Sequence, residues 1–335
     1  MTRNRSNPDG TPGEHVAEYY RQRASLGLLI TEGTQPSDDG QGYFDTPGIY
    51  TDAQVAGWRE VADAVHAEGG VLFIQLMHVG RVGHPDNTTH HRQPVAPSAI
   101  AAGAQIFTRA GLQDAPEPRA LSTEDVAGVI AEFRHAAASA IAAGADGVEI
   151  HAANSYLLHQ FLAPNANQRT DQYGGSVENR ARLVIEVAAA IADEIGADRT
   201  GIRLSPGLHI NGIDEGDQAA IRAQYEYLVA ELAKLDIAYI HLHHMGDDEL
   251  LKYIRATFPN TLLVLRSGRT RDQIADDIVA GLADMAPLGK WALANPDVVA
   301  RLKADAPFNE PDVATFYGGG AEGYTDYPTL EDVRA

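Results

Sequence analysis

The sequence of 335 residues contains no cysteine. This absence excludes disulfide bonds, thiolate zinc sites and cysteine nucleophiles, and it fits a reducing compartment such as the cytoplasm. Basic residues are also scarce, because 26 Lys and Arg stand against 46 Asp and Glu, for a net charge of −20. We therefore expect no binding to nucleic acid or to an anionic membrane, since both require a basic surface. No apolar run reaches the roughly 18 residues of a membrane span.

The sequence does contain a recurring alternation of apolar segments and helical patterns. The apolar segments are continuous, as is typical of strands that are covered on both faces. Such alternation predicts a parallel sheet, and the number of units favours a TIM (β/α)8 barrel. A doubly wound sheet is less favoured, because no G-x-G-x-x-G turn follows the first strand. The predicted strands are 26–33, 70–78, 147–154, 200–206, 237–244, 261–268 and 282–289, and the predicted helices are 13–25, 52–68, 123–142, 176–195, 218–235, 246–257, 270–281 and 295–304.

This pattern holds seven strands rather than eight, and the helix at 13–25 has no strand before it. We therefore expect an α/β TIM barrel whose first strand is missing from this chain. Three explanations of the start at Met1 stay open. The recorded start is misplaced, the chain is truncated but can still fold, or the chain is an inactive copy. The length favours one domain over residues 1–335, with an excursion at about 79–122 that is too long for a simple connection. The tail at 305–335 is rich in aromatics and is expected to be ordered.

Polar residues occur in and after several predicted strands, at the end of a barrel where enzymes build their sites. His151 ends the strand GVEI and Asn154 follows three residues later, so both could donate to one oxygen, and Tyr156 could supply a proton. The alternative is a satisfied histidine at a strand end beside a turn asparagine. Gln75 and Arg203 lie inside otherwise apolar strands. A buried guanidinium needs an anion, which is either a ligand or an internal carboxylate.

The last two predicted strands end in Ser267-Gly268 and Gly289-Lys290. Glycines there let backbone N–H groups approach a ligand, and these loops are the usual phosphate site of a TIM barrel. The alternative is a tight turn with a solvated lysine.

The 13 histidines also raise the question of a metal. His241 and His243 form an H-x-H pair on one strand face with His244 beside them, and His90 and His91 share a loop. No carboxylate set completes a ligand sphere around either group, so we expect no metal site.

Longer strings resemble the Old Yellow Enzyme family, which are FMN-dependent ene-reductases also called NADH:flavin oxidoreductases. The string YGGSVENR is highly specific, although Ser176 and Glu178 within it also make sense as the start of a helix. The resemblance extends from Thr2 to about residue 330. It is carried by HAANSY (151–156), FLAPNANQRTDQYGGSVENR (161–180) and GIRLSP (201–206), with support from TEGTQ (31–35) and FIQLMHVGR (73–81).

The resemblance implies a role for each candidate residue. It assigns the paired donors to the substrate oxygen to His151 and Asn154, and the proton donor to Tyr156. It places Met77 and Tyr317 in the substrate pocket. The residues implied to bind FMN are Thr2, Gly33, Gln75, Arg203, Ser267, Gly268, Gly289 and Lys290.

The implied reaction is the NAD(P)H-dependent reduction of the C=C bond of an α,β-unsaturated carbonyl compound, with hydride from flavin N5. The partner is then a small activated alkene, and a homodimer is one option for assembly. Two departures weaken the expected phosphate contacts, because the family usually has arginine at Lys290 and glycine at Ser267. Arg266 and Arg269 flank that serine as partial compensation. Two alternatives stay open: a truncated, flavin-poor and inactive barrel of the same family, and a Schiff-base aldolase that uses Lys290.

Overall fold

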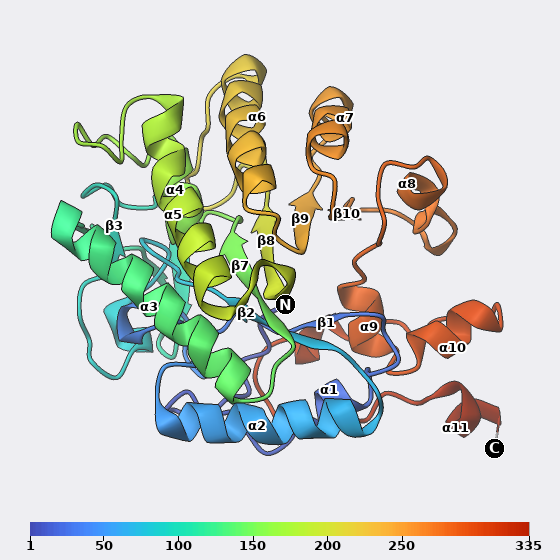
Figure 1. The fold of residues 1–335 in the computed structure, drawn as a ribbon. Coiled ribbons are helices and arrows are strands. Elements are labelled where there is room, and N and C mark those ends of the chain that lie inside the picture. The colour runs from blue at the N-terminus through green and yellow to red at the C-terminus, as the bar shows by residue number, and fades with distance from the viewer. Residues whose placement is uncertain (335) are drawn as a thin grey trace.

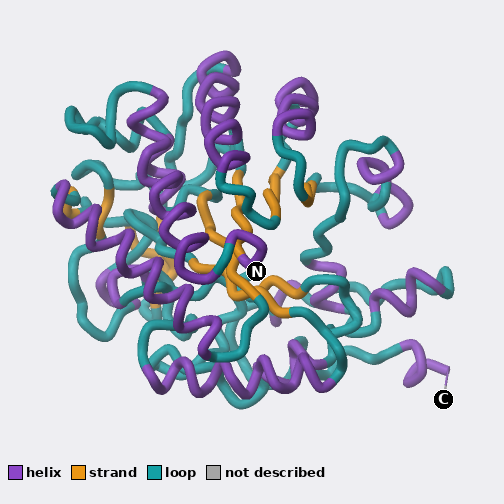
Figure 2. The backbone as a smooth tube through the Cα atoms, viewed as in Figure 1, coloured by secondary structure: helices purple, strands orange, loops and turns teal. Residues whose placement is uncertain are grey.

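The computed structural model describes residues 1–334. At its centre is a curled, all-parallel sheet, whose strands are drawn in orange in Figure 2. Six of the seven predicted strands are confirmed, and the seventh is reduced to a single bridge between Met285 and Leu263. Within residues 1–334, no strand pairs with the outer edge of the first strand. The strands, in sheet order, are β1 (Leu29–Ile30), β2 (Leu72–Leu76), β7 (Gly147–Ala152), β8 (Thr200–Leu204), β9 (Tyr239–His243) and β10 (Thr261–Leu265) (Figure 1).

Long helices form the outer layer and pack against one another in chain order, which confirms the TIM-barrel architecture. Polar caps fix where they begin. Thr51 and Ser122 form capping boxes, and the predicted cap Ser176 accepts a hydrogen bond from the N–H of Asn179. In Figure 1, α2 crosses below β2, and the C-terminal helices lie on the other side of the view from α3. The long helices are α2 (Asp52–Ala67), α3 (Thr123–Ala142), α5 (Val177–Ile195), α6 (Gln218–Lys234) and α7 (Asp248–Thr257), preceded by the short α1 (Val16–Arg21).

The helix predicted at 270–281 is wrong for most of its length. Only η4 (Arg271–Gln273) and α8 (Asp276–Val279) form there, separated by a turn at 274–275. Aspartate is a poor helix former, and Asp272, Asp276 and Asp277 all lie in this segment. The other short elements are α4 (Leu157–Leu162), α9 (Lys290–Ala294), α10 (Val298–Lys303), α11 (Leu330–Arg334), η1 (Asp38–Gly40), η2 (Pro85–Asn87), η3 (Ala197–Arg199) and η5 (Val313–Thr315).

Residues 79–122, the expected excursion, leave the end of β2. They contain an antiparallel hairpin of β4 (Gln105–Thr108) and β5 (Gly111–Asp114), and a parallel pair of β3 (Val95–Ala96) and β6 (Arg119–Ala120). The excursion also reaches the loop after β1, since the side chain of Asn87 donates to the carbonyl oxygens of both Gly42 and Phe107.

The aromatic tail is ordered, as predicted. Tyr324 is buried and stacks on Tyr19, with 4.1 Å between the ring centroids. The guanidinium groups of Arg3 and Arg5 lie over the Tyr324 ring, at 4.9 and 4.4 Å from its centroid. These cation–π contacts fasten the segment after Thr2 to the C-terminal tail.

Side chains inside the curled sheet form layers, because successive residues of a strand point to opposite faces. Phe73, Tyr239 and Leu263 form an apolar layer. Gly147 and Gly201 make room for it, since a Cβ atom at either position would overlap the ring of Phe73 or Tyr239. Two residues further along each strand, the side chains become polar. This polar layer consists of Gln75, Glu149, Arg203 and His241.

Candidate active site

A buried carboxylate, Glu149, organises the polar layer. Its Oε1 accepts a hydrogen bond from Nε2 of Gln75 at 2.6 Å, and its Oε2 lies 2.9 Å from Nδ1 of His241. Burial alone would raise the pKa of Glu149, but His241, Arg203 and the hydrogen bonds outweigh burial and lower it. An ionised carboxylate only accepts, so the amide of Gln75 must turn its NH2 group to Glu149. The carbonyl oxygen of Gln75 is then left for another donor.

Arg203 lies between His151 and His241 in the strand register. No carboxylate of residues 1–334 makes an ion pair with it, and its Nε is buried without a hydrogen-bond partner. Burial lowers the pKa of Arg203, and the charge of Glu149 opposes that shift from a distance. The alternative in which an internal carboxylate pairs with Arg203 is therefore wrong. A half-buried guanidinium without a carboxylate partner favours an anionic ligand.

His151 lies at the end of β7 and is buried. Its Nδ1 accepts a hydrogen bond from the N–H of Ala153 at 3.3 Å. Burial, with a smaller contribution from Arg203, lowers the pKa of His151 well below its ordinary value. The imidazole is therefore neutral and carries its proton on Nε2, where it can donate to an oxygen. Nearby, the backbone N–H of Asn154 donates to Oγ of Ser205, and the side-chain Oδ1 of Asn154 is buried without a partner.

Tyr156 packs edge-to-face against His151, with 5.0 Å between the ring centroids. Its hydroxyl lies 3.2 Å from the hydroxyl of Tyr43. Burial and then Tyr43 raise the pKa of Tyr156 well above its ordinary value, so the phenol is protonated and can act as an acid. Tyr317 is exposed and lies within electrostatic range of both hydroxyls.

The turn that carries Asn154 is strained, and contacts with buried polar side chains hold it in place. Asn154 and Ser155 both have positive φ angles, of 55° and 69°, which cost roughly 1–2 kcal/mol each for residues with a Cβ. The N–H of Ser155 donates to Nδ1 of His159 at 3.0 Å, and Nε2 of His159 lies 3.2 Å from Oε1 of Glu215. Tyr225 donates to the same carboxylate at 2.7 Å. This chain of buried contacts fixes the backbone between Asn154 and Tyr156.

Three further predicted residues lie close to the polar layer. A Cβ atom on Gly33 would overlap the buried side chain of Met77, so these two residues are in direct contact. Thr2 is half-buried. The amino group of the residue before it lies within electrostatic range of Arg203 and Glu149, which places the start of the described chain beside the site.

One predicted phosphate loop follows β10. The other follows the segment 282–289, which is bridged to β10 through Met285. The hydroxyl of Ser267 is 3.0 Å from Nε2 of His243, and Gly268 has a φ of 84° that favours glycine. Gly289 has open space where a Cβ would lie. Lys290 begins α9, and its Nζ lies 5.0 Å from the centroid of the Trp291 ring. The loops are therefore open to a ligand.

The two flanking arginines do not take part in these loops. Arg266 and Arg269 both form ion pairs with the buried carboxylate of Asp277, at 2.9 and 2.8 Å. Both arginines are thus paired within the protein, and the expectation that they compensate for weakened phosphate contacts is not supported. Lys290 remains as the basic residue of these loops that can contact a phosphate.

The histidines considered as metal ligands have other contacts. His241 bonds to Glu149, His243 to Ser267, and His244 lies 3.2 Å from a carboxylate oxygen of Asp248. Among residues 1–334, no group of three His, Asp or Glu is arranged to hold a metal ion. In the same part of the chain, no helix is long and apolar enough to cross a bilayer.

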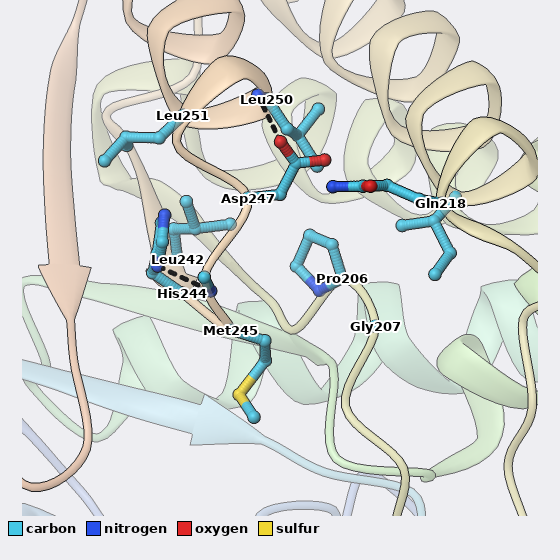
Figure 3. A pocket seen from close by; sticks show the side chains of 11 residues that line it. Pro206, Gly207, Gln218, Leu242, His244, Met245, Asp247, Leu250 and Leu251 are labelled. Atoms are coloured by element: carbon cyan, nitrogen blue, oxygen red, sulfur yellow. Dashed lines mark hydrogen bonds between the residues drawn. The ribbon is translucent and has the colours of Figure 1, made fainter.

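A cavity of about 280 Å³ opens beyond the ends of β8 and β9 (Figure 3). Pro206, Met245 and Leu251 are among the side chains that line it, and Asp247, on its wall, forms a bidentate ion pair with Arg222. No predicted site residue lines this cavity.

Sequence reasoning missed several residues of the site. Glu149 carried the same signal as Gln75 and Arg203, because it is an ionisable residue inside an apolar strand two positions before His151. Tyr43 lies in a loop of glycine, aspartate and aromatic residues without a motif, and only the three-dimensional structure brings it to Tyr156.

The unpartnered groups fit one kind of ligand. The Gln75 oxygen can accept from an imide N–H, Arg203 offers a half-buried positive charge, and the loops at Gly268 and Lys290 suit a phosphate. The fold and this donor set define a barrel enzyme built around a planar polar cofactor that bears a phosphate.

Comparisons with known proteins identify the family. The family model of the NADH:flavin oxidoreductase / NADH oxidase family matches residues 1–309, and the chain belongs to this family, that of the Old Yellow Enzymes. The protein is thus an oxidoreductase that uses FMN and a nicotinamide reductant.

Named relatives are similar over nearly the whole chain. 12-Oxophytodienoate reductase 2 of Arabidopsis thaliana is 40% identical over 96% of this chain and 88% of its own length. A probable flavin mononucleotide-dependent alkene reductase of Leishmania infantum is 40% identical over 98% of this chain and 92% of its own length. Among solved structures, morphinone reductase has a TM-score of 0.94 at 42% identity, covering 100% of this chain and 92% of that one.

Proposed function

We propose that the protein is an FMN-dependent ene-reductase that uses NAD(P)H to reduce the C=C bond of α,β-unsaturated carbonyl compounds. The observation that carries the proposal is the pairing of a neutral His151 with a protonated Tyr156 at the end of one barrel strand. Relatives named as alkene and 12-oxophytodienoate reductases support the same class of substrate.

In this proposal, FMN supplies hydride from N5 when it is bound. Gln75 and Arg203 hold its pyrimidine side, and the positive charge of Arg203 favours negative charge that develops there on reduction. Thr2 and Gly33 lie at the side of the barrel where the start of the chain meets the polar layer. Phosphate is assigned to the loops that contain Ser267, Gly268, Gly289 and Lys290.

The remaining residues act on the substrate. Nε2–H of His151 and the side-chain amide of Asn154 donate to the carbonyl oxygen, so that negative charge developing there meets preorganised donors. Tyr156 delivers a proton to the α-carbon, and Tyr43 holds its hydroxyl in place. Met77 and Tyr317 form part of the surrounding wall. Reductant and alkene then use the same space in turn.

We further propose one FMN-binding domain over residues 1–335, in the cytoplasm because the chain has no cysteine. NADPH and NADH are the two reductants to compare. We propose a homodimer as the assembly, which light scattering tests. No observation favours the aldolase alternative. A Schiff-base lysine is activated by desolvation or by a second cation, whereas Lys290 is exposed above Trp291.

The test is a purified protein that is yellow and oxidises NADPH faster when cyclohexenone is added. Replacing His151 and Asn154 together with alanine should lower enone turnover by at least about 10²–10³-fold while the yellow colour stays, because only the oxygen donors are lost. His135→Ala, on the exposed face of α3, is the control for the loss of a histidine. A colourless protein that cannot be reconstituted with FMN would refute the proposed function. Unchanged turnover in the double variant would show that the oxygen donors are other residues.

A further inference from the structure

Glu149 has no role in the function proposed above, although it is the carboxylate of the polar layer. Its relative exposure is 0%, and both of its oxygens are engaged. Taking a carboxylate out of water is costly unless its partners compensate it fully. A barrel interior can be filled largely with apolar side chains, as Phe73 and Leu263 in the neighbouring layer illustrate. A charged residue at this position therefore calls for a function.

Its first effect is on orientation. The amide of Gln75 has two faces that differ in hydrogen-bonding character, and an ionised carboxylate at 2.6 Å accepts only the NH2 face. The carbonyl oxygen of Gln75 is thereby fixed as an acceptor for the flavin. In the same way, Glu149 holds the proton of neutral His241 on Nδ1, since burial lowers the pKa of that imidazole.

Its second effect is electrostatic. The charged or titratable groups near Glu149 are Arg203, His241, the buried hydroxyl of Tyr239 and the amino group of Met1. Arg203 is the fixed positive charge among them, and Glu149 the fixed negative one. The two do not form an ion pair, and their opposite potentials add at any ligand bound beside the layer. A reduced flavin carries more negative charge than an oxidised one, so Arg203 favours reduction and Glu149 opposes it.

We propose that Glu149 is a positioning residue that fixes the amide of Gln75 toward the flavin and, by offsetting Arg203, lowers the reduction potential of the bound FMN. This inference rests on the proposed FMN site. In this inference, the reduction potential of the cofactor is set by two opposite charges of the polar layer, the buried Glu149 and the half-buried Arg203. A more negative potential makes the reduced cofactor a stronger hydride donor to the alkene.

The test is the midpoint potential of the holoprotein with Glu149→Gln, measured by dye-coupled reductive titration. Glutamine keeps the shape of the side chain and removes its charge, so the equilibrium between oxidised and reduced FMN should shift about tenfold toward the reduced form. For a two-electron couple this is about 30 mV in the positive direction. The control is Glu186→Gln, which removes a carboxylate that accepts a hydrogen bond from Tyr173 on the outer layer and should leave the potential unchanged.

A second comparison applies if Glu149→Gln does not retain FMN. The double variant Glu149→Gln/Arg203→Gln removes both charges of the polar layer and is measured against Arg203→Gln alone. The double variant should again lie positive of the single one by about tenfold in the same equilibrium. A potential that is unchanged or more negative on loss of Glu149 overturns the inference. A wild-type protein without FMN refutes the proposed function instead, so the two failures are distinct.

Discussion

Replacing Glu215 with alanine should cost more stability than removing any exposed charge of this protein. Glu215 lies between β8 and α6 and is 4% exposed. Its carboxylate accepts from the hydroxyl of Tyr225 and the N–H of Gly207, both at 2.7 Å, and lies 3.2 Å from Nε2 of His159. His159 in turn holds the N–H of Ser155, so the perturbation reaches the strained turn of the site.

The magnitude follows from what the substitution leaves behind. The hydroxyl of Tyr225 and the N–H of Gly207 would both lose their acceptor, and Nε2 of His159 would lose the carboxylate oxygen that lies 3.2 Å from it. Each buried group left without its partner costs about 1–3 kcal/mol. We therefore expect the free energy of unfolding to fall by about 3–5 kcal/mol. Glu215→Gln keeps one acceptor and should lose about half as much.

The assay is urea unfolding with FMN in constant excess, followed by far-UV circular dichroism. The matched control is Glu231→Gln on α6, which breaks an exposed pair with Lys234 and should cost less than about 1 kcal/mol. If Glu215→Ala costs no more than this control, the network does not support the turn and the reasoning fails.

The same carboxylate predicts a dependence on pH. Burial would raise the pKa of Glu215, but His159, Tyr225 and Gly207 outweigh burial and lower it below the ordinary value of 4.5. A lowered pKa in the folded state means that the stabilisation is present above about pH 4.5 and is lost as the pH falls through the lowered value. The stability difference between the wild type and Glu215→Gln should therefore narrow on acidification below pH 4.5. A constant difference down to pH 3 would contradict this assignment.

Two other substitutions separate the proposed roles within the site. Tyr156→Phe should lower alkene turnover by about 10²–10⁴-fold and leave the reduction of the enzyme by NADPH unchanged, as read by stopped-flow absorbance of the flavin; equal loss in both half-reactions would show that Tyr156 is not a proton donor. Lys290→Arg should tighten FMN binding by about tenfold, because a guanidinium can bind phosphate through two parallel hydrogen bonds. Quenching of flavin fluorescence gives the dissociation constant, and weaker binding by the arginine variant would place the phosphate elsewhere.

The strand pattern could be predicted from the sequence because strands covered on both faces are continuous apolar runs. Arg203 could be singled out for the same reason, since a charge inside such a run is conspicuous. The break in the helix predicted at 270–281 has only a weak local signal, because the low helix propensity of Asp272, Asp276 and Asp277 is a small effect for each residue. Tyr43 could not be identified from the sequence, because its contact with Tyr156 spans 113 residues of sequence.

The arrangement of Glu149 and Arg203 also explains how an acidic chain can keep the hydrogen-bond donors of a cation available to a ligand. A guanidinium paired directly with a carboxylate would have its hydrogen-bond donors occupied, and a flavin would have to displace that partner. A guanidinium with no negative charge nearby would be too costly to bury. Glu149 avoids both problems. It lies close enough to favour the charged form of Arg203, but its own hydrogen bonds are to Gln75 and His241. The donors of Arg203 therefore stay free while part of its burial is offset, and removing Glu149 should destabilise the protein more without FMN than with it.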